Sequence, residues 1–365
     1  MKQRTAALLL LAALLLTFPA VAAGSAGTAG DPVISLSYLN EVYVPQLESA
    51  WQTVAENALD PIAAESWQTL ADTVARANLL RAQSGEDRML RGMVRYKSGD
   101  VLTLRTGTKL TLLSGAAESC GPGLADVTNG RAIAAGESLP ENACAMAAGD
   151  CKVEITSATA CFLSQGAAAL SASAAVDYNS RADGLYRLGL FRGTDYGYEL
   201  ERSATRTEAL VMFLRLLGQE STALSWTGSH PFTDVPAWAD RYVSYAYAMG
   251  YTNGISATQF GGTQAVSARD YLTFLLRALA YAEGTDFAWA SAVEDSAHLG
   301  LITAGEQRLL DTGSFLRAQV AYCSWNALFS PTADGAWLLN TLLERGAVAR
   351  DDVVPAAVCI VGPRA

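Results

Sequence analysis

The sequence predicts an α+β protein with three parts: an N-terminal helical pair, a small all-β domain, and a C-terminal, mainly α-helical domain of three repeats. Three observations lead to this prediction. Apolar residues recur at helical spacing in residues 31–90, short β-rich runs alternate with glycine turns in residues 91–166, and one motif returns three times in residues 177–350. The chain has 365 residues and 50% of them are hydrophobic, so it can bury more than one core.

The first residues have the pattern of a secretory signal peptide. Lys2 and Arg4 precede an apolar run, residues 6–16, and small residues follow it. As a helix this run would rise only about 16 Å, well short of a bilayer core of about 30 Å. No cysteine precedes Cys120, so no lipoprotein anchor is expected. The sequence predicts export, with residues 1–23 removed and no membrane anchor left.

Composition limits the function classes. The 26 Lys and Arg residues against 36 Asp and Glu residues give a net charge of -10, which argues against a nucleic-acid partner. His230 and His298 are the only histidines, so a multi-histidine metal centre is excluded, and neither a metal nor a cofactor is expected. The common hydrolase and phosphate-loop motifs are absent, so we expect no catalytic residues. A wall-bound hydrolase remains an alternative.

The N-terminal helical segment is expected at residues 31–90. Trp51 and Trp67 each lie in an apolar stripe at helical spacing, and the second stripe is expected to end near Gln83. These positions are most simply core residues of two helices that pack together.

The small β domain is expected at residues 91–166, and the Ala/Ser-rich residues 167–176 are expected to be a linker. Four cysteines fall within this domain, without a Cys-x-x-Cys pair or a neighbouring histidine, so a zinc site is not expected. In an exported chain they allow three disulfide pairings, and free thiols are the alternative. They are Cys120, Cys144, Cys151 and Cys161.

Three diverged copies of one unit follow, at about residues 177–220, 230–284 and 285–348. The sequence GLFRG at 189–193 returns as GYTNG at 250–254 and, less closely, as GLITA at 300–304. After each of these, a short motif precedes an apolar helix. Repeats of this length indicate a unit that covers its apolar face by packing against its siblings.

The short motif has a local explanation. Thr205 and Glu208 are spaced as a capping box, and Ser267 and Asp270 repeat it in the second copy. Arg206 stands in the first helical turn, where the helix dipole disfavours a cation by a few tenths of a kcal/mol. Two interpretations are open: an ion pair with a nearby carboxylate, or an anion site formed by the helix N-terminus and the guanidinium.

The second copy resembles an S-layer homology repeat. Its Phe-x-Asp-Val at 232–235, Trp238-Ala239, Gly-x-x-x-Gly and capped helix match the pattern of that family, whose helix motif is Thr-Arg-Ala-Glu. The resemblance covers roughly residues 177–348. It implies a mainly helical pseudo-trimer that binds bacterial secondary cell-wall polysaccharide noncovalently, in grooves between repeats that contact an acidic, often pyruvylated, sugar.

The resemblance also implies which residues contact the glycan. Arg206 and Arg317 occupy the motif arginine position, whereas the second copy has Ala268 there and its arginine one place later. The third copy has Leu316 and Gln319 in place of Thr and Glu, so we favour sites beside Arg206 and Trp238, although core burial is the alternative for Trp238. The expected glycan-binding residues are Thr205, Arg206, Glu208, Asp234, Trp238, Gly254, Arg269 and Arg317.

The sequence therefore predicts an exported protein of the cell wall or S-layer surface, anchored by its repeats to secondary cell-wall polysaccharide. The alternative is a structural or adhesion scaffold whose repeats no longer bind glycan. The N-terminal part is similar to the region before these repeats in clostridial exported proteins, through residues 35–39 and the Ser-Gly-Asp and Thr-Gly-Thr turns. This second resemblance implies no activity.

Overall fold

The computed structural model describes residues 44–46, 69, 72–80, 85–194, 197–310, 315–362 and 364. The expected signal peptide and most of the expected first helix lie outside these residues. Residues 72–80 are helical, within the range expected for the second helix. The fold is a mixture of helix and sheet, with an all-β near-barrel sheet followed by C-terminal helices. None of the described helices is long and apolar enough to cross a membrane.

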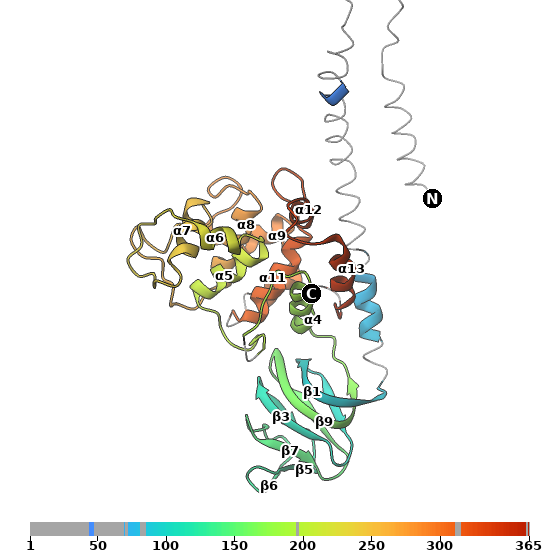
Figure 1. Ribbon diagram of the computed structural model, residues 1–365. Helices are drawn as coiled ribbons and strands as arrows, with labels where there is room; N and C mark the ends of the chain where they lie inside the picture. Colours follow the sequence, from blue (N-terminus) through green and yellow to red (C-terminus); the bar gives the residue numbers. More distant parts are fainter. Residues whose placement is uncertain are drawn as a thin grey trace, which may run out of the picture. The chain divides into compact units, whose positions relative to one another are not determined.

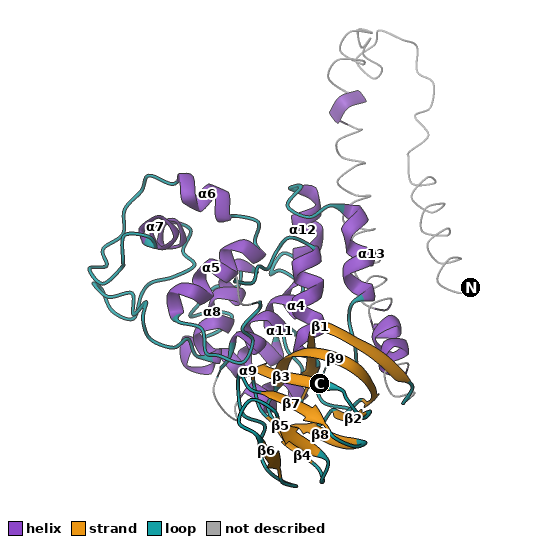
Figure 2. Ribbon diagram, turned by 60° about the horizontal axis from the view of Figure 1, so that its bottom comes forward, coloured by secondary structure: helices purple, strands orange, loops and turns teal. Residues whose placement is uncertain are grey.

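The sheet has nine strands and curves on itself (Figure 2). Their order is β4-β8-β2-β9-β3-β7-β5-β6, and β1 pairs with the remaining edge of β9. Backbone hydrogen bonds also join β4, at one end of this order, to residues 137–139, which follow β6 in the chain. The strands are β1 (Asp87–Lys97), β2 (Val101–Leu104), β3 (Lys109–Ser114), β4 (Ala117–Ser119), β5 (Leu124–Asp126), β6 (Arg131–Ile133), β7 (Cys144–Ala147), β8 (Cys151–Ile155) and β9 (Thr159–Ser171).

The β domain is longer than the sequence predicted at both ends. Residues 87–90, expected to be the end of the helical segment, form the start of β1, and residues 167–171, expected to be linker, form the end of β9. Small Ala and Ser side chains look like linker composition, but this stretch pairs with β1 on one edge and β2 on the other. Pairing on both edges stabilises a strand whose own residues have little β propensity.

Gly166, expected to end the domain, lies inside β9 at a close approach. Its φ is +132°, and an added Cβ would lie 2.6 Å from Thr108 Oγ1. The same hydroxyl donates to the Ala167 carbonyl and accepts from the Ala167 N–H. Glycine is therefore required where β9 passes the turn between β2 and β3.

We expect Gly166→Ala to destabilise the β domain by about 1–2 kcal/mol for the left-handed backbone and about 1–3 kcal/mol more for the clash. Gly107→Ala is the matched control, because Gly107 also has a positive φ, of +84°, but has open space around it. Urea unfolding should show the larger loss for Gly166→Ala. Equal losses would contradict the role given to the Thr108 contact.

The C-terminal part consists of helices joined by loops (Figure 1). Helices α5, α8 and α11 each contact the other two, and outside this group their most extensive helix contacts are with α7, α9 and α4 respectively. The helices are α4 (Tyr178–Arg187), α5 (Arg206–Leu216), α6 (Glu220–Ser225), α7 (Asp240–Ala248), α8 (Ala268–Ala278), the 3₁₀ helix η2 (Trp289–Ser291), α9 (Ala292–His298), α10 (Ala304–Leu310), α11 (Arg317–Leu328), α12 (Leu338–Glu344) and α13 (Arg350–Val358).

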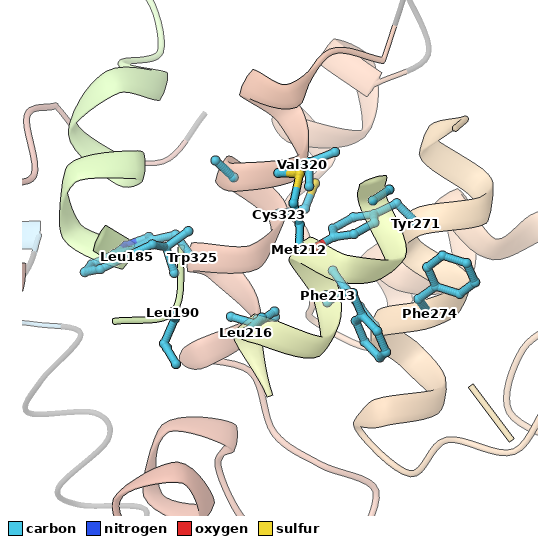
Figure 3. Close-up of a cluster of buried hydrophobic side chains, with 14 of the residues drawn as sticks. Leu185, Leu190, Met212, Phe213, Leu216, Tyr271, Phe274, Val320, Cys323 and Trp325 are labelled. Atoms are coloured by element: carbon cyan, nitrogen blue, oxygen red, sulfur yellow. The ribbon is translucent and has the colours of Figure 1, made fainter. Parts of the chain in front are cut away.

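One apolar core joins these helices (Figure 3). Phe213 of α5 contacts the ring of Phe274 of α8, and the Tyr271 hydroxyl of α8 lies 2.6 Å from the Ser324 hydroxyl of α11. Trp325 of α11 lies beside Gly184 of α4, where a Cβ would come within 2.6 Å of the indole. The three helices thus bury their apolar faces against one another.

All six cysteines are free thiols. Of the two alternatives left open for the four cysteines of the β domain, the structure has free thiols. Burial raises the pKa of the Cys151 and Cys161 thiols, which makes both poor nucleophiles. Cys323 is fully buried in the helical core.

Candidate functional site

Both predicted capping boxes are confirmed. The Thr205 hydroxyl accepts from the Glu208 N–H, and the Glu208 carboxylate accepts from the Thr205 N–H at 2.8 Å. Ser267 and Asp270 make the same exchange at the start of α8. These side chains fix where α5 and α8 begin. Thr205 and Glu208, both expected to contact glycan, are therefore engaged by the backbone.

Arg206 makes the ion pair that was one of its two interpretations. Its Nη1 lies 2.9 Å from Asp270 Oδ1, and its side chain is only 8% exposed. The guanidinium lies over the rings of Phe260 and Phe274, at 5.4 and 5.1 Å from their centroids. Burial lowers the pKa of Arg206, and the Asp270 charge only partly offsets this effect. Arg206 is thus a buried cation that links α5 to α8, and its guanidinium is not exposed to a polymer.

Arg317, the corresponding residue of the expected third copy, is buried as well. Its Nε donates to the Tyr198 carbonyl at 3.1 Å, and Glu208 is one of the carboxylates that stabilise its charge. Glu208 also accepts two hydrogen bonds from Arg202, at 2.9 and 2.8 Å. Neither motif arginine therefore presents a free guanidinium at the surface.

Asp234 and Gly254 shape the loop that covers Arg206. Both carboxylate oxygens of Asp234 accept backbone N–H groups, from Phe260 at 2.7 Å and from Gly261 at 2.8 Å. Gly254 has a φ of +73°, and a Cβ there would lie 2.4 Å from the Phe232 ring. Since Phe232 packs on Phe260, both residues hold in place the ring that covers the Arg206 guanidinium.

Trp238 is exposed, so its core interpretation is wrong. Its side chain precedes α7 and is 59% exposed. An exposed indole offers a flat apolar face with one N–H donor, which suits an amphipathic ligand. Its indole is accessible, but among the described residues no guanidinium lies over its ring.

A second exposed tryptophan, Trp289, was missed by the sequence analysis. It is 48% exposed and precedes α9 as Trp238 precedes α7. The Arg269 guanidinium lies 4.8 Å from its ring centroid, and its Nε1 donates to Asp270 Oδ1 at 3.1 Å. We call the group Arg206, Arg269, Asp270 and Trp289 the Trp289 cluster. It joins residues of all three expected copies.

The sequence does carry a signal for Trp289. Ala288-Trp289-Ala290 before α9 repeats Ala237-Trp238-Ala239 before α7. The distance from the preceding aspartate is one residue shorter in the third copy, which hides the match when the full Phe-x-Asp-Val motif is required.

The charges of the Trp289 cluster are unequally placed. Burial acts to raise the pKa of Asp270, but the Ser267 hydroxyl, the Arg206 charge and the Trp289 indole together bring it below its ordinary value. The buried Arg206 guanidinium thus neutralises the Asp270 charge. Arg269 is exposed and forms no ion pair within the described part of the chain. The cluster therefore presents one cation and one aromatic face to solvent.

No protein-family model matches this chain, and no curated protein is significantly similar to it. Within the residues that the structure describes, no group of three or more His, Cys, Asp or Glu side chains could hold a metal ion.

Proposed function

We propose that this chain is an exported cell-envelope protein that binds secondary cell-wall polysaccharide noncovalently through three repeats, with the Trp289 cluster as a contact surface. The observation that carries the proposal is the register in which the repeats join. It agrees with a closed, mainly helical pseudo-trimer, the arrangement that the resemblance to S-layer homology repeats implies.

Two joints between copies use the same hydrogen bonds. At the start of α5 the Arg206 N–H donates to the Gln264 carbonyl and the Thr207 N–H to the Gly262 carbonyl. At the start of α11 the corresponding donors, Arg317 and Ala318, bind the carbonyls of Arg202 and Leu200. Gln264 and Arg202 each lie three residues before the N-cap of the following helix, Ser267 and Thr205 respectively. Gly262 and Leu200 each lie five residues before the same caps. An equal register at two joints is what copies of one unit produce.

Helix packing supports the same arrangement. The capped helix of each expected copy packs on the first helix of the next: α5 on α7, α8 on α9, and α11 on α4. The last of these contacts returns to the first copy and closes the ring. Each copy thus covers its apolar face with its neighbour's helix.

The surface chemistry fits an acidic sugar. A guanidinium binds a carboxylate with paired, charge-assisted hydrogen bonds, and the Trp289 ring offers an apolar face to the C–H side of a pyranose. An acidic protein that binds an acidic polymer needs such a local cation against its own net charge of -10. Arg269 meets this need, since Arg206 is committed to Asp270.

The proposal is tested by sedimenting the full chain with purified wall sacculi. The sacculi are used before and after mild acid has removed the polysaccharide to which a protein can bind noncovalently. We expect the protein to pellet with untreated sacculi and to stay in solution after extraction. Pelleting that survives extraction would contradict polysaccharide anchoring. No pelleting in either case would favour the alternative, a scaffold without glycan affinity.

A further inference from the structure

We infer that only one of the three joints between copies binds the polymer, the joint of α5 with α8 that carries the Trp289 cluster. This inference rests on the proposed function and specifies its site. The three joints have the same plan. The first residue of one helix (Arg206, Ala268 or Arg317), here called the motif position, is opposite the third residue of the next (Asp270, Gln319 or Glu208 respectively), here called the acid position. They differ in charge and in what covers them.

The joint of α8 with α11 has lost both charged partners. Arg206 faces Asp270 at one joint, and Arg317 is stabilised by Glu208 at another. The corresponding positions at the joint of α8 with α11 are Ala268 and Gln319, which are both neutral. Without a cation at position 268, a carboxylate at position 319 would have no partner charge to neutralise. The two neutral residues are therefore consistent with each other.

A buried tyrosine fills this neutral joint. Gln319 hydrogen-bonds the Tyr178 hydroxyl, and the Tyr178 side chain is buried against Tyr322. Tyr178 begins α4, as Trp289 comes at the start of η2 and α9, so it takes the place that the exposed tryptophan has beside α8. Among the described residues, neither the motif position nor the opposing position of this joint carries a charge, and the buried Tyr178 stands in place of an exposed indole.

The joint of α11 with α5 is covered by the β domain. A cleft of about 710 Å³ lies here, between Ser114, Glu141 and Thr159 on one side and Glu199, Glu201 and Leu316 on the other. The Thr159 hydroxyl donates to the Glu201 carboxylate across it.

The charges in this cleft exclude an acidic polymer. The one arginine among its lining residues, Arg202, is held by Glu208 and Glu199, and the lining also includes the carboxylates of Glu141 and Glu201. Carboxylates that line a partly enclosed cleft repel an anion, and the dielectric there, lower than in water, strengthens the repulsion. The β domain thus closes a second joint to the polymer.

The joint of α5 with α8 has neither obstacle. Trp289 and Arg269 are both exposed, and the acid of this joint is neutralised by the buried Arg206. The ligand class is a sugar carrying one carboxylate, with Arg269 on the acid and Trp289 under the ring.

The test is isothermal titration calorimetry of the full chain with polysaccharide fragments that mild acid releases from the sacculi. It measures the number of sites per chain and their affinity. We expect one site per chain, and at least a tenfold loss of affinity in Arg269→Ala. Arg192→Ala is the matched control, because Arg192 is an exposed arginine of the same domain, away from the cluster, and should bind as the wild type does.

The outcomes separate the inference from the proposed function. Two or three sites per chain, or one site that survives Arg269→Ala, would overturn the inference and leave wall anchoring in place. No binding of any fragment would overturn both. One site lost in Arg269→Ala and kept in Arg192→Ala supports both.

Discussion

Arg206→Ala is expected to destabilise the helical domain by up to about 3–5 kcal/mol, because it leaves the partly buried Asp270 carboxylate without its cation. The Arg206 and Asp270 side chains are 8% and 19% exposed, and the guanidinium also lies against the Phe260 and Phe274 rings. Urea unfolding at neutral pH measures this loss. Wall binding should fall by more than the unfolded fraction, since the Asp270 carboxylate would then repel the anionic polymer without its cation.

Arg269→Ala is the control for Arg206→Ala. Both arginines belong to the Trp289 cluster, but Arg269 is exposed and stacks on Trp289. We expect its removal to change the free energy of unfolding by less than about 0.5 kcal/mol, as most surface substitutions do. A stable Arg206→Ala variant would contradict the buried ion pair as the bond that joins α5 to α8.

The second large effect is expected from Glu306→Gln in α10. The Glu306 carboxylate is buried and accepts from Tyr322 at 2.6 Å, from Asn326 at 3.0 Å and from Arg364 at 2.7 Å. It also caps α10 through the Thr303 N–H. Removing its charge leaves the Arg364 guanidinium without its partner, at a cost of about 3–5 kcal/mol. Glu294→Gln, on the exposed side of α9, is the control and should unfold as the wild type does.

This carboxylate also predicts how stability depends on pH. Burial acts to raise the pKa of Glu306, but Arg364, Tyr322 and the Thr303 N–H together lower it below the ordinary value. A carboxyl whose pKa is lower in the folded state stabilises the protein above its unfolded pKa, about 4.3, and loses that contribution as the pH falls through the folded value. The wild type should therefore lose stability on acidification below about pH 4, and Glu306→Gln should lose less. Equal pH dependence of the two proteins would contradict this assignment.

The parts of the fold that were predicted from sequence are those decided locally. The capping boxes of Thr205 and Ser267 depend on residues three positions apart, and both are confirmed. The end of β9 was missed because residues 167–171 are stabilised by pairing partners far away in the chain, which Ala and Ser composition does not reveal.

The candidate site shows the same division. Arg206 was singled out correctly as a cation that needs compensation, yet only the fold brings Asp270 to it from 64 positions further along the chain. Trp238 was weighed as a core residue because tryptophan is usually buried, and the loop before α7 leaves it exposed. Trp289 lies in the copy whose motifs are most altered, so its pairing with Arg269 and Asp270 becomes visible only in three dimensions.

The most direct test of the account is the retention of Trp289→Ala on intact wall sacculi, measured beside the wild type and Trp238→Ala at equal protein concentration. Both tryptophans are exposed, so both variants should unfold at the same urea concentration as the wild type. We expect Trp289→Ala to stay in solution and Trp238→Ala to pellet as the wild type does. Retention of Trp289→Ala at the wild-type level would contradict the Trp289 cluster as the contact with the wall.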